Sequence, residues 1–199
     1  MLKNTGVLIL AGGRSSRMDF PKPWLQYNER SSFLEHIIHI YQKVGVTTVA
    51  TVINSDFCKN PWVAKIEAIS KDCTVISNDQ PDLGRLYSIQ LGLAHFQSDN
   101  IYIHNVDSPF VSEKLIADLA AVHHGSGVTI PVKEGRKGHP ILISQDVKKT
   151  ILERYAAFNS LRDLILEFEQ KLVDTDDDGI FVNINTPEQY KQLTGERIR

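Results

Sequence analysis

The sequence predicts an α/β fold built on a mostly parallel sheet. Short apolar runs typical of strands alternate with longer patterns typical of helices, and several helical patterns begin at Ser or Pro and end at Gly. Such alternation favours crossover connections, which make neighbouring strands parallel. Of the 199 residues, 42% are hydrophobic, enough to bury a sizeable core, and no low-complexity segment interrupts them. Residues 1–199 are therefore interpreted as a single domain.

The strands expected in order are residues 6–10, 48–53, 74–77, 100–106, 127–131, 140–143 and 180–184. The helices expected between and after them are residues 33–44, 61–70, 84–96, 112–124, 145–155, 160–168 and 187–193. The first helix has a clear start signal, because Ser32 precedes it and Glu35 follows three residues later, as in a capping box.

A loop of small and basic residues follows the first strand. Gly12 and Gly13 let backbone N–H groups approach an anion closely, and Arg14, Arg17 and Lys22 supply positive charge, so this loop predicts a phosphate-binding site. It has neither the Gly-Lys-Ser/Thr ending of a P-loop nor the three glycines of a dinucleotide-binding loop. Since the next helix begins only after Ser32, the loop itself is expected to wrap the ligand.

Composition narrows the class of ligand. A formal net charge of −2 lacks the basic surplus that binding to a phosphate backbone requires, so no nucleic acid is expected as a partner. No apolar run approaches the ~20 residues that span a bilayer, and the N-terminus lacks a signal-peptide pattern. We therefore expect a cytoplasmic protein with no membrane partner and with small phosphate-bearing ligands.

Other polar residues follow later strands. Ligands of open α/β sheets bind beyond the carboxyl ends of the strands, so these residues are expected to converge on one cleft. Asp107 follows the apolar run 101–106, where its carboxylate is placed to hold Mg²⁺, although an Asp in such a position is also a common turn residue.

The loop from Leu10 to Lys22 resembles the signature of the MocA/MobA-like nucleotidyltransferases, the molybdenum cofactor cytidylyltransferases and guanylyltransferases. That signature reads Leu-Ala-Gly/Ala-Gly-x-Ser-x-Arg-Met-Gly-x-x-Lys. Asp19 departs from it, standing where the family has glycine; the acid either repels a triphosphate or shapes the turn. The resemblance implies a three-layer α/β/α fold of the GT-A-like type.

The resemblance also implies a set of site residues. Lys22, Arg17 and Asp107 would be catalytic, and Asp107 and Asn183 would hold Mg²⁺, with Asn185 interpreted as the cap of the following helix. The nucleotide would contact Leu10, Ala11, Gly12, Gly13, Arg14, Ser15, Arg17, Lys22, Asn78, Gly84 and Ser88. The acceptor substrate would contact Arg136, Lys137, Gly138 and His139, within a Gly-Arg-Lys-Gly-His-Pro segment similar to that of the cytidylyltransferase branch.

The function implied is Mg²⁺-dependent transfer of a nucleoside monophosphate from a nucleoside triphosphate to a phosphate-bearing acceptor of the molybdopterin type, with release of pyrophosphate. The loop from Leu10 to Gly13 resembles the guanylyltransferase form, whereas the 135–140 segment favours CTP, the preferred prediction. Transfer to a sugar or polyol phosphate is an alternative. So is a non-catalytic accessory role, binding nucleotide or cofactor for a molybdoenzyme or its chaperone.

Overall fold

The computed structural model describes residue 2 and residues 4–194. Its strands are β1 (Thr5–Ala11), β2 (Gln26–Asn28), β3 (Ser31–Ser32), β4 (Thr48–Asn54), β5 (Thr74–Asn78), β6 (Asn100–Asn105), β7 (Val128–Lys133), β8 (Arg136–Lys137), β9 (Ile141–Ile143) and β10 (Gln170–Asp174). Its α-helices are α1 (Phe33–Lys43), α2 (Val63–Ile69), α3 (Gly84–Leu93), α4 (Glu113–Val122), α5 (Gln145–Arg154), α6 (Leu161–Ile165) and α7 (Pro187–Thr194). Short 3₁₀ helices are η1 (Lys22–Trp24), η2 (Ser55–Cys58), η3 (Pro81–Leu83), η4 (Tyr155–Ala157) and η5 (Asp178–Phe181).

The main sheet has the strand order β10-β7-β9-β6-β1-β4-β5, with β8 paired to β7. The pairs β1–β4, β1–β6, β4–β5 and β7–β10 are parallel, whereas β9 is antiparallel to both of its neighbours. The carboxyl ends of β1, β4, β5, β6 and β7 therefore share one edge. The predicted mostly parallel sheet is confirmed.

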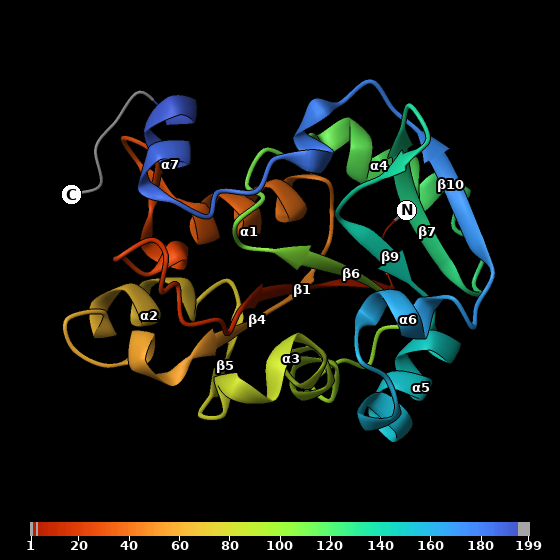
Figure 1. Cartoon of the computed structure of the whole chain (residues 1–199), viewed down its shortest axis with the longest axis horizontal. Helices are drawn as coiled ribbons and strands as arrows, with labels where there is room; N and C mark the ends of the chain where they lie inside the picture. The colour runs from red at the N-terminus through yellow and green to blue at the C-terminus, as the bar shows by residue number, and fades with distance from the viewer. Residues whose placement is uncertain (1, 3, 195–199) are drawn as a thin grey trace.

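Helices cover both faces of this sheet, as Figure 1 shows. Every residue of β1 is buried, and its side chains alternate between two cores. Val7 and Ile9 pack in the core that includes residues of α1, α2, α4 and α7, whereas Leu8 and Leu10 pack in the core formed with α3, α5 and α6. A central strand with both faces covered needs an almost wholly apolar sequence, and β1 has one. The three-layer α/β/α architecture is confirmed.

The capping box predicted for α1 is present. Ser32 N donates to Glu35 Oε2 at 2.7 Å, and Glu35 N donates to Ser32 Oγ at 3.4 Å. Among the residues that the structure describes, no helix is both long and apolar enough to cross a bilayer.

One predicted strand is wrong, and another was missed. Residues 180–184 do not pair in a sheet; η5 and an extended segment follow instead, tied by the bonds from His139 N to Ile180 O and from Ile184 N to Asp107 O. The strand beside β7 is β10, for which the sequence predicts no strand. The predicted helix 160–168 ends earlier, at Ile165.

Candidate functional site

A cavity of about 360 Å³ opens at the carboxyl edge of the sheet, where residues distant in sequence meet. The end of β1, the phosphate loop, the start of α3 and the turn after β6 all contribute. The lining residues are Leu10, Ala11, Gly12, Gly13, Ser15, Lys22, Pro23, Pro81, Gly84, Arg85, Ser88, Asn105, Val106, Asp107 and Asn183. We call this cavity the nucleotide cleft. The structure thus brings together most of the residues predicted from the first, third and fourth strands.

The phosphate loop, residues 12–22, is held by its own backbone. Met18 N donates to Ser15 O at 2.9 Å, Lys22 N donates to Ser15 Oγ at 3.2 Å, and the Met18 side chain is buried beneath the loop. Ser15 and Asp19 have positive φ values, 52° and 53°. The left-handed conformation at Asp19 explains why glycine suits this position, and Asp tolerates it better than most residues. Asp19 is exposed and is not among the residues lining the cleft, so it shapes the turn.

Lys22 is the centre of a polar cluster inside the cleft. Its Nζ donates to Asp107 Oδ2 at 2.9 Å and to Asn185 Oδ1 at 2.7 Å, and Arg17 Nη2 donates to the same Asn185 oxygen at 3.1 Å. The side chains of Lys22 and Asp107 are 13% and 22% exposed, so this ion pair is partly shielded from water. The three predicted catalytic residues are therefore linked: Lys22 bonds Asp107 directly, and the Asn185 amide, predicted to have another role, joins Lys22 to Arg17.

Asn185 is the functional candidate that sequence reasoning assigned wrongly. The cap of α7 is formed by Thr186 and Gln189: Gln189 N donates to Thr186 Oγ1 at 3.3 Å, and Gln189 Oε1 accepts from the amides of Asn185 and Thr186. Because Thr186 performs the capping, the Asn185 side chain is free to reach Lys22 and Arg17. Asn and Thr are both good capping residues, so the Asn185-Thr186-Pro187 sequence could not show which of the two would cap α7.

Asn183 and Asp107 are brought to the same end of the cleft by neighbouring backbone. Ile184 N donates to Asp107 O at 2.8 Å, and Ser108 Oγ donates to Asn183 Oδ1 at 2.7 Å. The amide oxygen of Asn183 thus already accepts one hydrogen bond. An amide oxygen has a second lone pair, so this bond leaves it able to contact another group.

A buried network supports the turn that carries Asp107. His104 Nε2 lies 2.9 Å from Ser108 O, and its Nδ1 lies 3.0 Å from Tyr41 Oη. Since a carbonyl only accepts, Nε2 carries the proton and Nδ1 accepts from Tyr41. Burial lowers the pKa of His104 to about 4, so this histidine is neutral at pH 7. The network holds the turn from within the core.

Asn78 and Ser88 are used mainly to build the cleft wall. Asn78 is fully buried; its Nδ2 donates to Ser88 Oγ at 3.1 Å, and its Oδ1 accepts from Gln80 N at 2.8 Å. A Cβ on Gly12 would lie 2.9 Å from Ser88 Oγ, so this glycine permits the loop to pack against α3. Gly84 has φ +86°, a conformation that glycine adopts without strain. These predicted nucleotide-binding residues fix the shape of the wall.

Arg14 lies at the exposed rim of the cleft, paired with Asp82 of η3. Its Nε and Nη2 donate to the two Asp82 oxygens at 2.9 Å and 2.5 Å, forming a bidentate pair between the phosphate loop and the start of α3. The hydrogen bonds from Arg14 lower the pKa of the Asp82 carboxyl. No local pattern in the sequence indicates this pairing, because the partners are 68 residues apart in the chain.

The predicted acceptor-binding residues line a second cavity, of about 670 Å³, next to the first. Its walls come from the β7–β8 turn, from α6 and from Arg85; we call it the second cavity. Arg136 lies over the Phe181 ring at 4.5 Å, and Lys137 Nζ donates to Gln170 Oε1 at 2.6 Å. Gly138 is a packing position, since a Cβ there would lie 2.6 Å from Ile180 Cβ.

His139 lines the second cavity and is not a titrating base near pH 7. Burial and the charge of Arg85 lower its pKa to about 4. Its Nδ1 is buried and forms no hydrogen bond within the described part of the chain. Arg85 itself lines both cavities, and the sequence analysis did not assign it a role although it lies between Gly84 and Ser88.

Known proteins of similar sequence match nearly the whole chain. The chain is 28% identical over 201 residues to the probable molybdenum cofactor guanylyltransferase of Bacillus cytotoxicus, covering 96% of this chain and 97% of that protein. It is 26% identical over 197 residues to the molybdenum cofactor guanylyltransferase of Vibrio cholerae, covering 96% of this chain and 91% of that protein.

The fold is shared with solved structures. A nucleotidyl transferase from Methanothermobacter thermautotroptrophicus superposes with a TM-score of 0.77 at 21% identity, over 96% of each chain. Residues 7–173 match the MobA-like NTP transferase domain, which spans β1 to β10 and contains the phosphate loop, the turn after β6 and the β7–β8 turn. This match shows that the chain belongs to the family of MobA-like NTP transferases.

Proposed function

We propose that this nucleotidyltransferase transfers a nucleoside monophosphate from a nucleoside triphosphate to a phosphate group on a small acceptor. The observation that carries the proposal is the meeting of a glycine-rich loop with Lys22 and Asp107 at the carboxyl edge of the sheet, beside a second cavity rich in cations. Open α/β sheets bind ligands at such an edge. Two adjacent cavities suit a reaction between two substrates.

The chemistry needs positioning and charge neutralisation more than covalent catalysis. An oxygen of the acceptor phosphate attacks the α-phosphorus, the new P–O bond forms, and the bond to the β-phosphate oxygen breaks as pyrophosphate leaves with the electron pair. The acceptor phosphate is already ionised near neutral pH, so no general base is required. Lys22 and Arg17, which lie together beside Asp107, would stabilise the negative charge that develops on the phosphates.

The residues of the cleft fit a magnesium ion. Asp107 offers a carboxylate, and Asn183 offers an amide oxygen that accepts only one hydrogen bond. Within the described residues no group of three or more His, Cys, Asp or Glu side chains is arranged around a metal site. Mg²⁺ commonly takes one or two carboxylates and completes its shell with water and phosphate oxygens, so this sparse set suits a metal that arrives with the nucleotide. When bound, it would neutralise phosphate charge.

GTP is the donor that we propose. The two guanylyltransferases described above match nearly the whole chain, which favours GTP over the CTP that the 135–140 segment suggested. CTP stays as a second candidate because that segment, now found on the second cavity, resembles the cytidylyltransferase branch. The acceptor that we propose is molybdopterin or its molybdenum-loaded form, by analogy with the names of these relatives.

The first experiment measures pyrophosphate release with Mg²⁺, comparing GTP, CTP, ATP and UTP with and without molybdopterin. We expect turnover that depends on molybdopterin and is fastest with GTP. The Asp107→Ala variant, shown by circular dichroism to be folded, is expected to lose ~10²-fold or more in kcat, as when one preorganised electrostatic group is removed.

Other outcomes lead to different conclusions. Fastest turnover with CTP would replace the donor, and turnover only with a sugar or polyol phosphate would replace the acceptor. Binding of nucleotide without pyrophosphate release from any acceptor would favour an accessory role. An unchanged kcat in folded Asp107→Ala protein would contradict the role of Asp107.

A further inference from the structure

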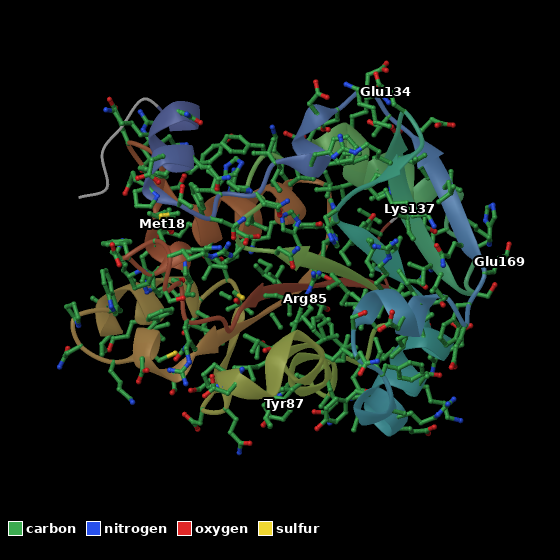
Figure 2. The ribbon with its side chains drawn as sticks, viewed as in Figure 1. Met18, Arg85, Tyr87, Glu134, Lys137 and Glu169 are labelled. Carbon is green, nitrogen blue, oxygen red and sulfur yellow. The ribbon has the colours of Figure 1, made fainter. Side chains whose placement is uncertain are left out.

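The nucleotide cleft and the second cavity share one lining residue, Arg85. It lies in the first turn of α3, directly after Gly84, whose positive φ turns the chain into the helix. In Figure 2 Arg85 is labelled near the centre of the molecule, whereas Tyr87 of the same helix is labelled near its outer edge. Arg85 is thus the cation at the junction of the two cavities.

The charges around Arg85 come from both sides of this junction. Asp107 of the nucleotide cleft and His139 of the second cavity both interact electrostatically with its guanidinium. The Asp107 carboxylate already accepts from Lys22, and His139 is neutral at pH 7. No hydrogen bond of the Arg85 guanidinium is found in the described part of the chain, although its side chain is exposed to the cavities.

Most other cations near the cavities have partners, whereas Arg162, which lines the second cavity only, has none in the described part of the chain. Arg14 is paired with Asp82 and Arg17 with Asn185, while Arg136 covers the Phe181 ring. Lys137 bonds Gln170. Arg85 therefore has its five N–H donors available for a ligand, in the planar fork that matches phosphate oxygens. The start of α3 adds the positive end of a helix dipole at the same place.

On the basis of the function proposed above, we propose that Arg85 binds the phosphate of the acceptor and holds it against the nucleotide. A bidentate contact from this position would fix the acceptor oxygen that attacks the α-phosphorus while the rest of the acceptor occupies the second cavity. The lining of that cavity contains cations and apolar side chains but no carboxylate, which suits an anionic acceptor with an apolar body. Arg85 would then be a catalytic residue.

The test compares wild-type protein with Arg85→Ala, Arg85→Lys and the control Arg30→Ala. Arg30 is an exposed arginine that lines neither cavity. Nucleotide binding is measured with a fluorescent GTP analogue. Binding of molybdopterin and of inorganic phosphate is measured separately, each with a saturating non-hydrolysable GTP analogue present. Acceptor-dependent pyrophosphate release is measured with the same proteins.

We expect Arg85→Ala to weaken binding of molybdopterin and of phosphate about 10- to 100-fold, the usual effect of losing charged hydrogen bonds, and to change GTP-analogue binding about twofold at most. Arg85→Lys should restore part of the loss, because lysine keeps the charge without the fork. Added guanidinium ion should partly restore acceptor binding to Arg85→Ala, which a merely structural role would not allow. Arg30→Ala should behave as wild type.

The results separate this proposal from the proposed function. Arg85-dependent binding of either probe without pyrophosphate release would support the role of Arg85 and overturn the transferase reaction with that acceptor. A loss of GTP-analogue binding in Arg85→Lys and Arg85→Ala, with the two probes bound as before, would assign Arg85 to the triphosphate and overturn the proposal. Wild-type protein that binds neither probe would also overturn it.

Discussion

The Lys22 ammonium donates to two oxygen acceptors, one on Asp107 and one on Asn185. Both acceptors lie more than 80 residues from Lys22 in the chain. We expect Lys22→Ala to lower kcat ~10²-fold, because a preorganised cation at the reacting phosphates would be lost. Lys22→Arg should recover only part of the loss, because arginine and lysine differ in the geometry of their donors. Pyrophosphate release under saturating substrates measures the effect.

Lys43→Ala is the matched control for this change, because Lys43 forms an exposed ion pair with Glu113 on the outer helices. It should retain full activity. A Lys22→Ala protein that keeps more than a tenth of the wild-type kcat would show that Lys22 does not act on the reacting phosphates.

Asp82 pairs with Arg14 at the rim of the cleft, where it would compete with a bound phosphate for the guanidinium. We expect Asp82→Asn to tighten binding of GTP several-fold, because the Arg14 fork is released and one negative charge near the triphosphate is removed. The gain should shrink at high salt, since the charges are exposed. Titration with a fluorescent GTP analogue at two ionic strengths measures both effects, with Asp118→Asn, from an exposed pair on α4, as control. Weaker binding in Asp82→Asn would contradict this account.

At the scale of residues, the phosphate loop could be predicted because its chemistry lies in consecutive positions. Gly12 to Lys22 and Asp107 after an apolar run are local patterns, and the structure brings them to one cleft. Arg85 and Asp82 could not be assigned, because an arginine or an aspartate at the start of a helix looks like an ordinary solvated side chain until its neighbours are known. The Arg85 and Asp82 variants described above test the roles proposed for these two residues.

At the scale of elements, the wrongly predicted strand and the missed strand have related causes. Residues 180–184 form a mainly apolar run like a buried strand, yet Asp177 accepts from Gly179 N and starts η5, and Ile180 packs against Gly138. β10 lies at the edge of the sheet with one partner strand, and its exposed Leu172 and flanking polar residues give no clear alternation. Edge strands carry little of the pattern on which the prediction depends.

The capping box of α1 offers a direct test of one element. Ser32→Ala removes the hydroxyl that accepts from Glu35 N, and we expect a loss of about 1 kcal/mol in the free energy of unfolding. Urea denaturation measures it. Ser126→Ala, in an exposed turn, should change the free energy of unfolding by less than about 0.5 kcal/mol. Equal stabilities of the two variants would mean that the cap contributes nothing.

At the scale of the whole molecule, the order of strands and helices was enough to predict the fold class. Each β–α–β repeat predicts a parallel pair, and four such pairs exist. The reversed direction of β9 could not be predicted, since its apolar run is the same whichever way it points. Its short connection from β7 through β8 sets that direction.

Acid should destabilise the whole molecule through its histidines. Burial lowers the pKa values of His36, His104, His123 and His139 to about 4, so each stays neutral in the folded state while its unfolded counterpart gains a proton near pH 6.5. The stabilisation is therefore complete above pH 6.5 and is lost as the pH falls toward 4. Each such histidine can contribute a slope of up to about 1.4 kcal/mol per pH unit.

Urea denaturation at pH 7, 6 and 5 measures this loss. His104→Gln should flatten the dependence on pH even though it lowers stability at pH 7, whereas the exposed control His124→Gln should keep the wild-type slope. Stability that stays constant from pH 6.5 to pH 5 would contradict the neutral state of these histidines.

The segment from Ile180 to Asn185 touches both cavities in succession. Its first residue accepts from His139 N beside the second cavity, its middle lines the nucleotide cleft, and its last side chain holds Lys22. Only a few residues of backbone separate the two ends, so we expect a displacement at one end to move the other. The two substrates should therefore bind synergistically, each lowering the dissociation constant of the other by the same factor, which a thermodynamic cycle of titrations would measure.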